Sequence, residues 1–207
     1  MAFFEIDGLS ISFGGLKALD NISFSVRQGE IYAIIGPNGA GKTTLFNCVH
    51  GIYPPAGGRI VFKGQDIRGK KPDKITKAGI ARTFQNIELF SNMNTMENIM
   101  RGRHLFMKGG FLRGGLMWGR RSFVGREEIE NRGKVEEIID FLDLQAVRNK
   151  FVGGLAYGIQ KKIELGRALA AEPELLLLDE PCAGMNAEEK QDMIFWIKDI
   201  QDELGIT

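Results

Sequence analysis

The stretch that decides the fold is "GPNGAGKTT", Gly36–Thr44. It follows the apolar segment "IYAII" and precedes helix-compatible residues, so it fits the pattern G-x-x-x-x-G-K-[ST] between a strand and a helix. Glycines let the backbone turn its N–H groups toward phosphate oxygens, and the start of a helix adds partial positive charge. The pattern predicts a phosphate-binding loop in an α/β domain. The alternative is a glycine-rich turn with a solvated lysine.

The side chains of this stretch suit a polyphosphate and its metal. Lys42 offers a point cation to the β- and γ-phosphates, and the Thr43 hydroxyl offers an oxygen to Mg²⁺. The residues that we expect around the phosphates are Gly36, Asn38, Gly39, Ala40, Gly41, Lys42, Thr43 and Thr44.

A second motif, "LLLLDEP", begins at Leu175 and places two acids after a run of leucines. Such a run is typical of a strand buried on both faces, and α/β sheets bind ligands at the carboxyl ends of their strands. We expect Asp179 to bind Mg²⁺ through water, and Glu180 to orient or deprotonate the water that attacks the γ-phosphate. The alternative is a solvated acidic turn after a core strand.

Composition limits the class of protein. The chain has 207 residues, 43% of them hydrophobic, which suits one globular domain with a subdomain. Its net charge of +1 gives no sign of nucleic-acid wrapping, and its two cysteines, Cys48 and Cys182, form no CxxC pair. The sequence has neither a signal-peptide pattern nor an apolar run of membrane-spanning length, so we expect a soluble chain in a reducing compartment.

The order of expected elements indicates an α/β core with an inserted helical subdomain. Strands are expected at 3–6, 22–26 and 31–35, a helix from Lys42, and mainly helix from about 95 to 171. We assign residues 1–88 and 165–207 to the nucleotide-binding core and 89–164 to the helical subdomain. The last helix is expected to begin with a capping box of Asn186 and Glu189 and to stop at Gly205.

With the hexapeptide "LAYGIQ", residues 155–160, lying about twenty residues before Asp179, the chain resembles the ATP-binding subunits of ABC transporters over nearly its whole length. The resemblance implies a P-loop ATPase fold of the ABC type with an N-terminal antiparallel β segment, and it implies ATP and Mg²⁺ as ligands. In that family a signature similar to LSGGQ begins a helix. Its N–H groups reach the γ-phosphate held by the other subunit of a head-to-tail dimer.

The resemblance assigns Leu155, Ala156, Tyr157 and Gly158 to this signature. Ala156 stands where serine is usual, Tyr157 where glycine is usual and Ile159 where glutamine is usual. The backbone donors do not depend on these side chains. The alternative is an ordinary helix start with its apolar stripe buried.

Other family positions fall on single residues. Phe13 corresponds to the aromatic residue that stacks on adenine, although a lone Phe also suits a core. Gln85 corresponds to the glutamine that contacts Mg²⁺ and the attacking water. "CAGMN", 182–186, corresponds to the dimer-contact loop, with Asn186 in place of the usual aspartate.

The variants "LAYG" and "AGMN" and the insertion at 104–126 resemble the branched-chain amino acid uptake subfamily. This resemblance implies a second ATP-binding subunit, permease subunits, an indirect link to a substrate-binding protein, no nucleic acid, and a peripheral place on the cytoplasmic face of the membrane. The cargo, homo- or heterodimerisation and the insertion's role stay open. The insertion suits a membrane partner, lipid headgroups or a mobile loop equally.

The family also uses a histidine after the strand that follows the last helix, and neither His50 nor His104 matches it. Ile206-Thr207 resemble the first residues of that strand, so we expect a C-terminally truncated cassette with low activity on its own. Two alternatives stand beside a transport ATPase: a soluble ABC ATPase acting in translation or on DNA, and a nucleotide-binding fragment that does not turn over.

Overall fold

The structure, a computed structural model, describes residues 2–107 and 123–207. Most of the predicted 104–126 insertion lies outside these residues. The chain divides into two compact units. Unit 1 contains Met1–Arg82, Glu174–Asp179 and Ile197–Thr207, and unit 2 contains Thr83–Pro173 and Glu180–Trp196. The bounds assigned from sequence to the core and the subdomain remain predictions.

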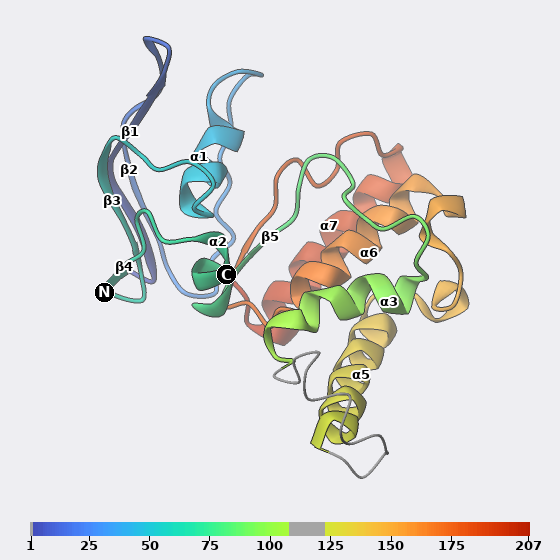
Figure 1. The fold of residues 1–207 in the computed structure, drawn as a ribbon. Coiled ribbons are helices and arrows are strands. Elements are labelled where there is room, and N and C mark those ends of the chain that lie inside the picture. Colours follow the sequence, from blue (N-terminus) through green and yellow to red (C-terminus); the bar gives the residue numbers. More distant parts are fainter. Residues whose placement is uncertain (1, 108–122) are drawn as a thin grey trace. The chain divides into compact units, whose positions relative to one another are not determined.

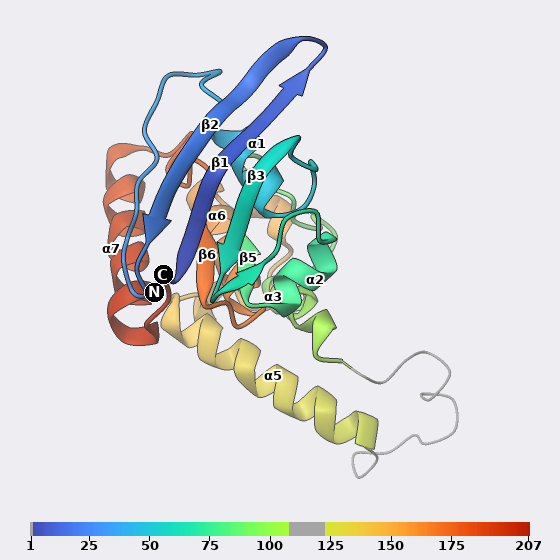
Figure 2. The ribbon, with the colours of Figure 1, turned by 90° about the vertical axis from the view of Figure 1, so that its left-hand side faces the viewer.

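Unit 1 carries a four-stranded antiparallel sheet in the order β2-β1-β3-β4 (Figure 2). Its strands are β1 (Phe4–Phe13), β2 (Leu16–Val26), β3 (Gly57–Phe62) and β4 (Gln65–Asp66). Gly14 and Gly15 join β1 to β2 with φ angles of 52° and 87°. Positive φ at both positions is what a two-residue hairpin turn needs, and glycine adopts it without a steric penalty.

A second, parallel pair of strands completes unit 1. β5 (Ile80–Arg82) pairs with β6 (Leu175–Leu177), and Arg82 lies opposite Leu177. The helices α1 (Lys42–Val49) and α2 (Pro72–Lys77) lie on the same side of the antiparallel sheet (Figure 1). One apolar core joins the antiparallel sheet, the two helices and the β5–β6 pair. In it, Ile6 and Ile60 of the sheet, Val49 of α1 and Ile75 of α2 are almost completely buried.

The expected strand at 31–35 is wrong: the segment before the phosphate loop has no regular structure. Ile35 is 93% exposed, and Ile31 is 55% exposed. The physical reason is the absence of a ladder partner. None of the described strands pairs with this segment, and the free edge of β6 bonds Thr207, whose N–H donates to the Glu174 carbonyl and whose carbonyl accepts from Leu176. An apolar run forms a strand only where a neighbour satisfies its backbone groups.

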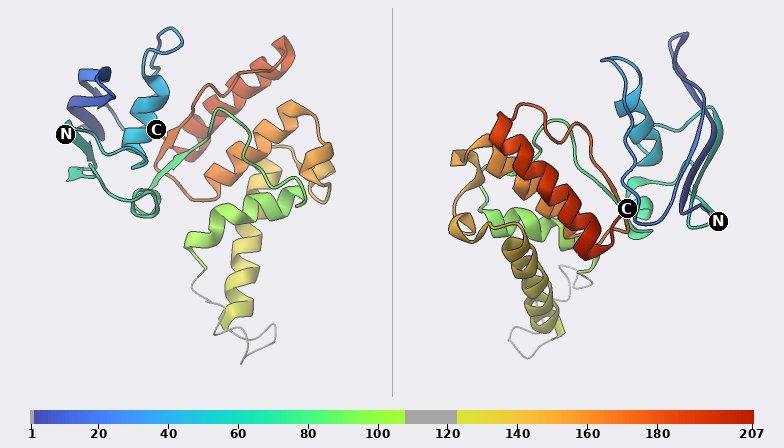
Figure 3. Two further views of the ribbon diagram at one scale, coloured as in Figure 1. Left: turned by 45° about the horizontal axis from the view of Figure 1, so that its top comes forward. Right: turned by 180° about the vertical axis from the view of Figure 1, so that it is seen from behind.

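Unit 2 is helical (Figure 3). It contains α3 (Thr95–Met100), η1 (Arg101–Leu105), α5 (Phe123–Phe141), η2 (Gln145–Val147), η3 (Val152–Gly154), α6 (Tyr157–Leu169) and the first part of α7 (Ala187–Leu204). At Gly166, a Cβ would lie 3.1–3.3 Å from the side chains of Ile99 in α3, Ile138 in α5 and Leu142, the residue after α5, so the lack of a side chain allows the helices to approach closely. In the described part of the chain, no helix is long and apolar enough to cross a membrane.

Candidate active site

The phosphate loop in unit 1 ends where α1 begins. Gly41 is the N-cap with φ of 90°, and a Cβ there would lie 2.5 Å from the Ala18 carbonyl oxygen. Both the left-handed backbone and the close approach require glycine. The helix therefore starts at Lys42 as expected, with the N–H groups of its first turn lacking partners within the helix.

The other loop residues are accessible to a ligand. Asn38, Gly39, Ala40 and Thr43 are exposed, while Gly36 and Thr44 are half-buried. The Lys42 ammonium donates to the Gly36 carbonyl at 2.7 Å and to the Pro37 carbonyl at 3.1 Å. The lysine thus bridges back over its own loop. A bound phosphate would compete for this cation with two neutral carbonyls, which are weaker partners than an anion.

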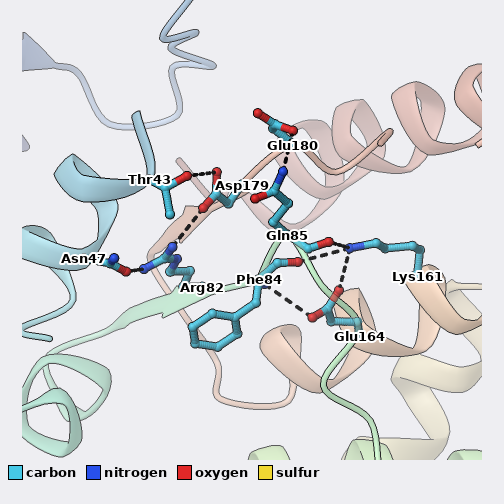
Figure 4. A network of polar contacts seen from close by, with 9 residues as sticks. All are labelled: Thr43, Asn47, Arg82, Phe84, Gln85, Lys161, Glu164, Asp179 and Glu180. Carbon is cyan, nitrogen blue, oxygen red and sulfur yellow. Dashed lines mark hydrogen bonds and ion pairs between the residues drawn. The ribbon is translucent and has the colours of Figure 1, made fainter. Parts of the chain in front are cut away.

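Asp179 meets the loop inside unit 1 (Figure 4). The Thr43 hydroxyl donates to Oδ1 of Asp179 at 3.4 Å, although 136 positions separate the two residues. The Asp179 side chain is 2% exposed. These two oxygens form a hard donor set of the kind Mg²⁺ uses when a substrate phosphate supplies further ligands, so the residues present fit the ion. Gln85, the third predicted magnesium ligand, belongs to unit 2, and its role remains a prediction.

The ion pair of Asp179 with Arg82 was not predicted from the sequence. The Arg82 guanidinium donates to Oδ2 of Asp179 at 2.8 Å and to Oδ1 of Asn47 at 2.6 Å. Arg82 ends β5 and Asp179 follows β6, so the pairing of these two strands brings the charges together. No sequence signal marks this ion pair, because its members are 97 residues apart.

Unit 2 brings the second predicted acid to the predicted glutamine. The Gln85 amide donates to Oε2 of Glu180 at 3.0 Å. Glu180 has φ of 49°, a left-handed conformation that costs an ordinary residue energy and that clusters at functional sites. The carboxylate predicted to activate water is therefore held on a strained turn by the side chain predicted to contact the same water.

A buried ion pair on α6 holds the backbone of Phe84 and Gln85 in place through hydrogen bonds (Figure 4). Lys161 Nζ donates to the Phe84 and Gln85 carbonyls at 3.1 and 2.9 Å and to Oε2 of Glu164 at 3.1 Å. The other oxygen of Glu164 accepts from the Phe84 N–H at 3.3 Å. The i,i+3 spacing of Lys161 and Glu164 was visible in the sequence, but it is typical of any solvated helix face.

The hexapeptide begins α6, as both interpretations of it required. Ala156 is the N-cap and makes no side-chain hydrogen bond, so the first helical N–H groups have no capping oxygen. Leu155 is half-buried and Tyr157 is exposed. A Cβ at Gly158 would lie 2.5 Å from Oε1 of Glu189, so the start of α7 packs directly against this turn.

Two contacts extend this packing. The capping box is confirmed: Asn186 Oδ1 accepts from the Glu189 N–H at 2.9 Å, and the Glu189 carboxylate accepts from the Asn186 N–H at 3.0 Å. Gly184 of the predicted dimer-contact loop lies against the Tyr157 ring, with its virtual Cβ 3.1 Å away. Tyr157, where the family usually has glycine, therefore supports this loop.

Phe13, Cys48 of α1 and His50, the C-cap of α1, complete the site of unit 1. Phe13 is 45% exposed and packs edge-on against Tyr53, with ring centroids 5.2 Å apart. Its open position leaves room for a base, and the stacking role remains a prediction. Burial raises the pKa of the Cys48 thiol to about 11. Burial, and to a lesser extent the Arg82 charge, lowers the pKa of His50.

Comparisons with known proteins agree with the motifs. The chain matches the family "ABC transporter" over residues 19–183. It is 37% identical to the "high-affinity branched-chain amino acid transport ATP-binding protein BraF" of Pseudomonas aeruginosa, covering 98% of this chain and 78% of that protein. It is 35% identical to the protein of the same description, LivG, of Escherichia coli K12, with the same coverage.

Solved structures give the same result. A nucleotide-free ATP-binding cassette from an ABC transporter superposes with a TM-score of 0.84 at 32% identity, covering 100% of this chain and 79% of that chain. A cassette in its ADP conformation superposes equally well, also at 32% identity. The length of the match and the level of identity leave one conclusion: this chain belongs to the ABC transporter family, as an ATP-binding subunit related to those of branched-chain amino acid transporters.

Proposed function

We propose that this chain is an Mg²⁺-dependent ATPase that powers the import of branched-chain or related amino acids through a membrane permease. The observation that carries the proposal is the meeting of the Thr43 hydroxyl and the Asp179 carboxylate beside the phosphate loop. The names of BraF and LivG supply the substrate class. The proposal includes a dimer of ATP-binding subunits, permease subunits, an indirect link to a substrate-binding protein, and a peripheral place on the cytoplasmic face of the membrane.

The chain's own residues divide the chemistry. The loop amides and Lys42 bind the phosphates, Phe13 stacks on the base, and Thr43 and Asp179 would hold Mg²⁺, which neutralises phosphate charge when it is bound. Glu180 takes the proton from the attacking water. The Gln85 amide donates to one carboxylate oxygen of Glu180 and leaves the other to accept that proton.

The start of α6 contributes to the site of the second subunit. Leu155, Ala156, Tyr157 and Gly158 present uncapped N–H groups, and an anion at a helix N-terminus is stabilised by these donors and by the helix dipole. Because no side-chain oxygen caps α6, its donors remain available to a γ-phosphate. The hexapeptide thus acts in trans.

Nucleotide binding tests the loop first. Lys42→Ala should weaken ATP binding at least about 100-fold in a calorimetric titration, because the cation matched to the phosphates is lost. Lys17→Ala is the matched variant, since Lys17 is an exposed lysine of the same unit paired with Asp20. Equal ATP affinity of the Lys42→Ala variant and the parent would contradict the phosphate-loop assignment.

Hydrolysis and dimerisation test the two acids and the hexapeptide. Glu180→Gln should bind Mg-ATP normally, lose turnover and elute as an ATP-dependent dimer on a sizing column. Gly158→Asp would collide with Glu189, so Ala156→Asp is the sharper variant. An aspartate at this N-cap stabilises α6 but occupies the donors and repels the γ-phosphate. Normal turnover by the Ala156→Asp variant would show that the hexapeptide is only a helix start.

A mixing experiment separates action in trans from action in cis. A dimer of one Ala156→Asp subunit and one Lys42→Ala subunit keeps one composite site with an intact loop and an intact hexapeptide. Partial ATPase activity of the mixture, with none from either variant alone, is the expected result.

Uptake by membrane vesicles tests the substrate. Vesicles that contain the chain and its permease should take up leucine but not glutamate in an ATP-dependent manner, and uptake of neither would refute the import proposal.

A further inference from the structure

Arg82 is a deeply buried charged residue of unit 1 to which the proposed chemistry assigns no role. Its side chain and that of Asp179 are each 2% exposed. The guanidinium lies 5.7 Å from the centre of the Phe46 ring and also bonds the Asn47 amide oxygen, so residues of α1 hold it on two sides. A planar, permanently charged fork in such a position has one geometry.

The two oxygens of Asp179 consequently differ. Oδ2 accepts from Arg82 at 2.8 Å, and Oδ1 accepts from the Thr43 hydroxyl at 3.4 Å (Figure 4). Only Oδ1 points to the place where Thr43 would share a cation. Arg82 therefore fixes which oxygen of the carboxylate would be free to hold a cation.

Charge matters as much as geometry. The charges of the Asp179 carboxylate and the Arg82 guanidinium cancel just after the buried strand β6. The Lys42 ammonium adds a positive charge at the phosphate loop. Mg²⁺ gives up its water reluctantly and binds where anionic oxygens gather. Without a polyphosphate, the described residues of unit 1 offer it a neutralised carboxylate and one hydroxyl.

We propose that Arg82 is a positioning residue that makes divalent-cation binding by Thr43 and Asp179 conditional on bound nucleotide. In the nucleotide-free protein, the guanidinium masks the Asp179 charge, and the cation enters only with the phosphates. The inference rests on the proposed function for the ATP-bound state, whereas masking in the free state depends on the chain's own charges alone.

Manganese binding in the absence of nucleotide tests the masking. Free Mn²⁺ is measured by its paramagnetic resonance signal while the full chain is titrated. The parent should bind no Mn²⁺ below millimolar concentration. Arg82→Gln should bind it at least about tenfold more tightly. A cation beside a carboxylate lowers the affinity of that carboxylate for a proton by about one to three decades, and the same charge repels a metal ion.

Two variants distinguish charge from mere packing. Arg82→Lys keeps the positive charge and should bind Mn²⁺ as weakly as the parent, although it loses the fork. Arg59→Gln removes a surface arginine of the same unit, paired with Asp7, and should change nothing. A folded Arg82→Gln variant that binds nucleotide-free Mn²⁺ no better than the parent would overturn the proposal.

Asn47→Asp covers the case in which Arg82→Gln fails to fold. It keeps the arginine but adds a second carboxylate that competes for the guanidinium, so nucleotide-free Mn²⁺ binding should again strengthen. Unchanged binding would count against the masking. In a parallel series with ATP, the parent should bind Mn²⁺ tightly. If the parent binds neither ATP nor ATP-dependent Mn²⁺ while Arg82→Gln still gains free Mn²⁺, the proposed function fails and the masking role stands.

Discussion

Each unit contains a fully buried ion pair that includes or contacts a residue of the candidate site, but the two pairs are built differently. In unit 1, Arg82 and Asp179 come from the ends of neighbouring strands, 97 residues apart. In unit 2, Lys161 and Glu164 are three positions apart on α6. Both pairs are at most 3% exposed. One pair is made by the pairing of strands, and the other by one turn of a helix.

The difference lies in what each pair holds. The unit 1 pair acts on a side chain, because Arg82 orients the Asp179 carboxylate. The unit 2 pair acts on a backbone, because Lys161 and Glu164 together bond the N–H and carbonyl of Phe84 and the carbonyl of Gln85. Burying two charges is expensive, and a buried pair by itself is weak support for stability. Both pairs are better understood as devices that set the position of a reactive group.

The largest effect is expected from breaking the unit 2 pair. Lys161→Met should lower the free energy of unfolding by about 3–5 kcal/mol, because Glu164 is left buried with one backbone N–H as its remaining described partner. Urea denaturation measures it. The double variant Lys161→Met/Glu164→Leu should recover part of the loss. A double variant as unstable as the sum of the single ones would show that the two charges are not coupled.

Glu164→Gln sharpens the same comparison. Lys161 then keeps the two carbonyls of Phe84 and Gln85, so this change should cost less than Lys161→Met. Exchange of the Phe84 amide proton should accelerate, since the acceptor loses its charge. If Glu164→Gln lowers the free energy of unfolding as much as Lys161→Met, the hydrogen bonds of Lys161 to the two carbonyls contribute nothing to stability.

A smaller effect is expected at the phosphate loop of unit 1. Gly41→Ala should cost about 2–4 kcal/mol, because a left-handed alanine is strained and its Cβ would approach the Ala18 carbonyl. Gly69→Ala is the matched change, with φ of 70° but nothing within 4 Å of its Cβ, and should cost about 1–2 kcal/mol. Thermal unfolding separates the two, and equal losses would mean that the close approach is unimportant.

Acid should weaken unit 1 through His50. Its pKa in the folded protein is lowered by burial and by Arg82, while in the unfolded chain it titrates near its ordinary value of 6.5. Below pH 6.5 the unfolded state therefore binds more protons, and the free energy of unfolding falls as the pH drops. His50→Gln should flatten this dependence in urea titrations from pH 7.5 to 5.5. An unchanged slope would mean that other groups dominate.

The smallest effect is expected from an exposed pair. Lys63 and Glu174 lie 2.8 Å apart, with side chains about half exposed, and Lys63→Met should change stability by less than about 1 kcal/mol. Glu174 begins the segment that leads to β6, so this variant shows what an ion pair contributes there without burial. A loss as large as that of Lys161→Met would remove burial as the cause of the difference between the pairs.

Local features of the site were predictable. The helix start at Lys42, the Asn186–Glu189 capping box and the turn of Asp179 after a leucine strand each depend on residues a few positions apart. Glycine φ preferences, capping oxygens and apolar runs act over such distances whatever the rest of the chain does. The resemblance to the ABC family rested on the motifs "GPNGAGKTT", "LLLLDEP" and "LAYGIQ", which are also local, and the comparisons confirmed it.

The sequence by itself thus determined the family and predicted the phosphate loop and the two acids, whereas the tertiary structure alone decided which partners hold these residues. Ile31–Ile35 has the composition of a strand, yet no described strand pairs with it and the segment is irregular. Arg82 reaches Asp179 only because β5 pairs with β6. Lys161 bonds the Gln85 carbonyl only because the backbone of Gln85 passes beside α6. A backbone ladder or a buried charge needs a partner from elsewhere in the chain, and no local pattern names that partner.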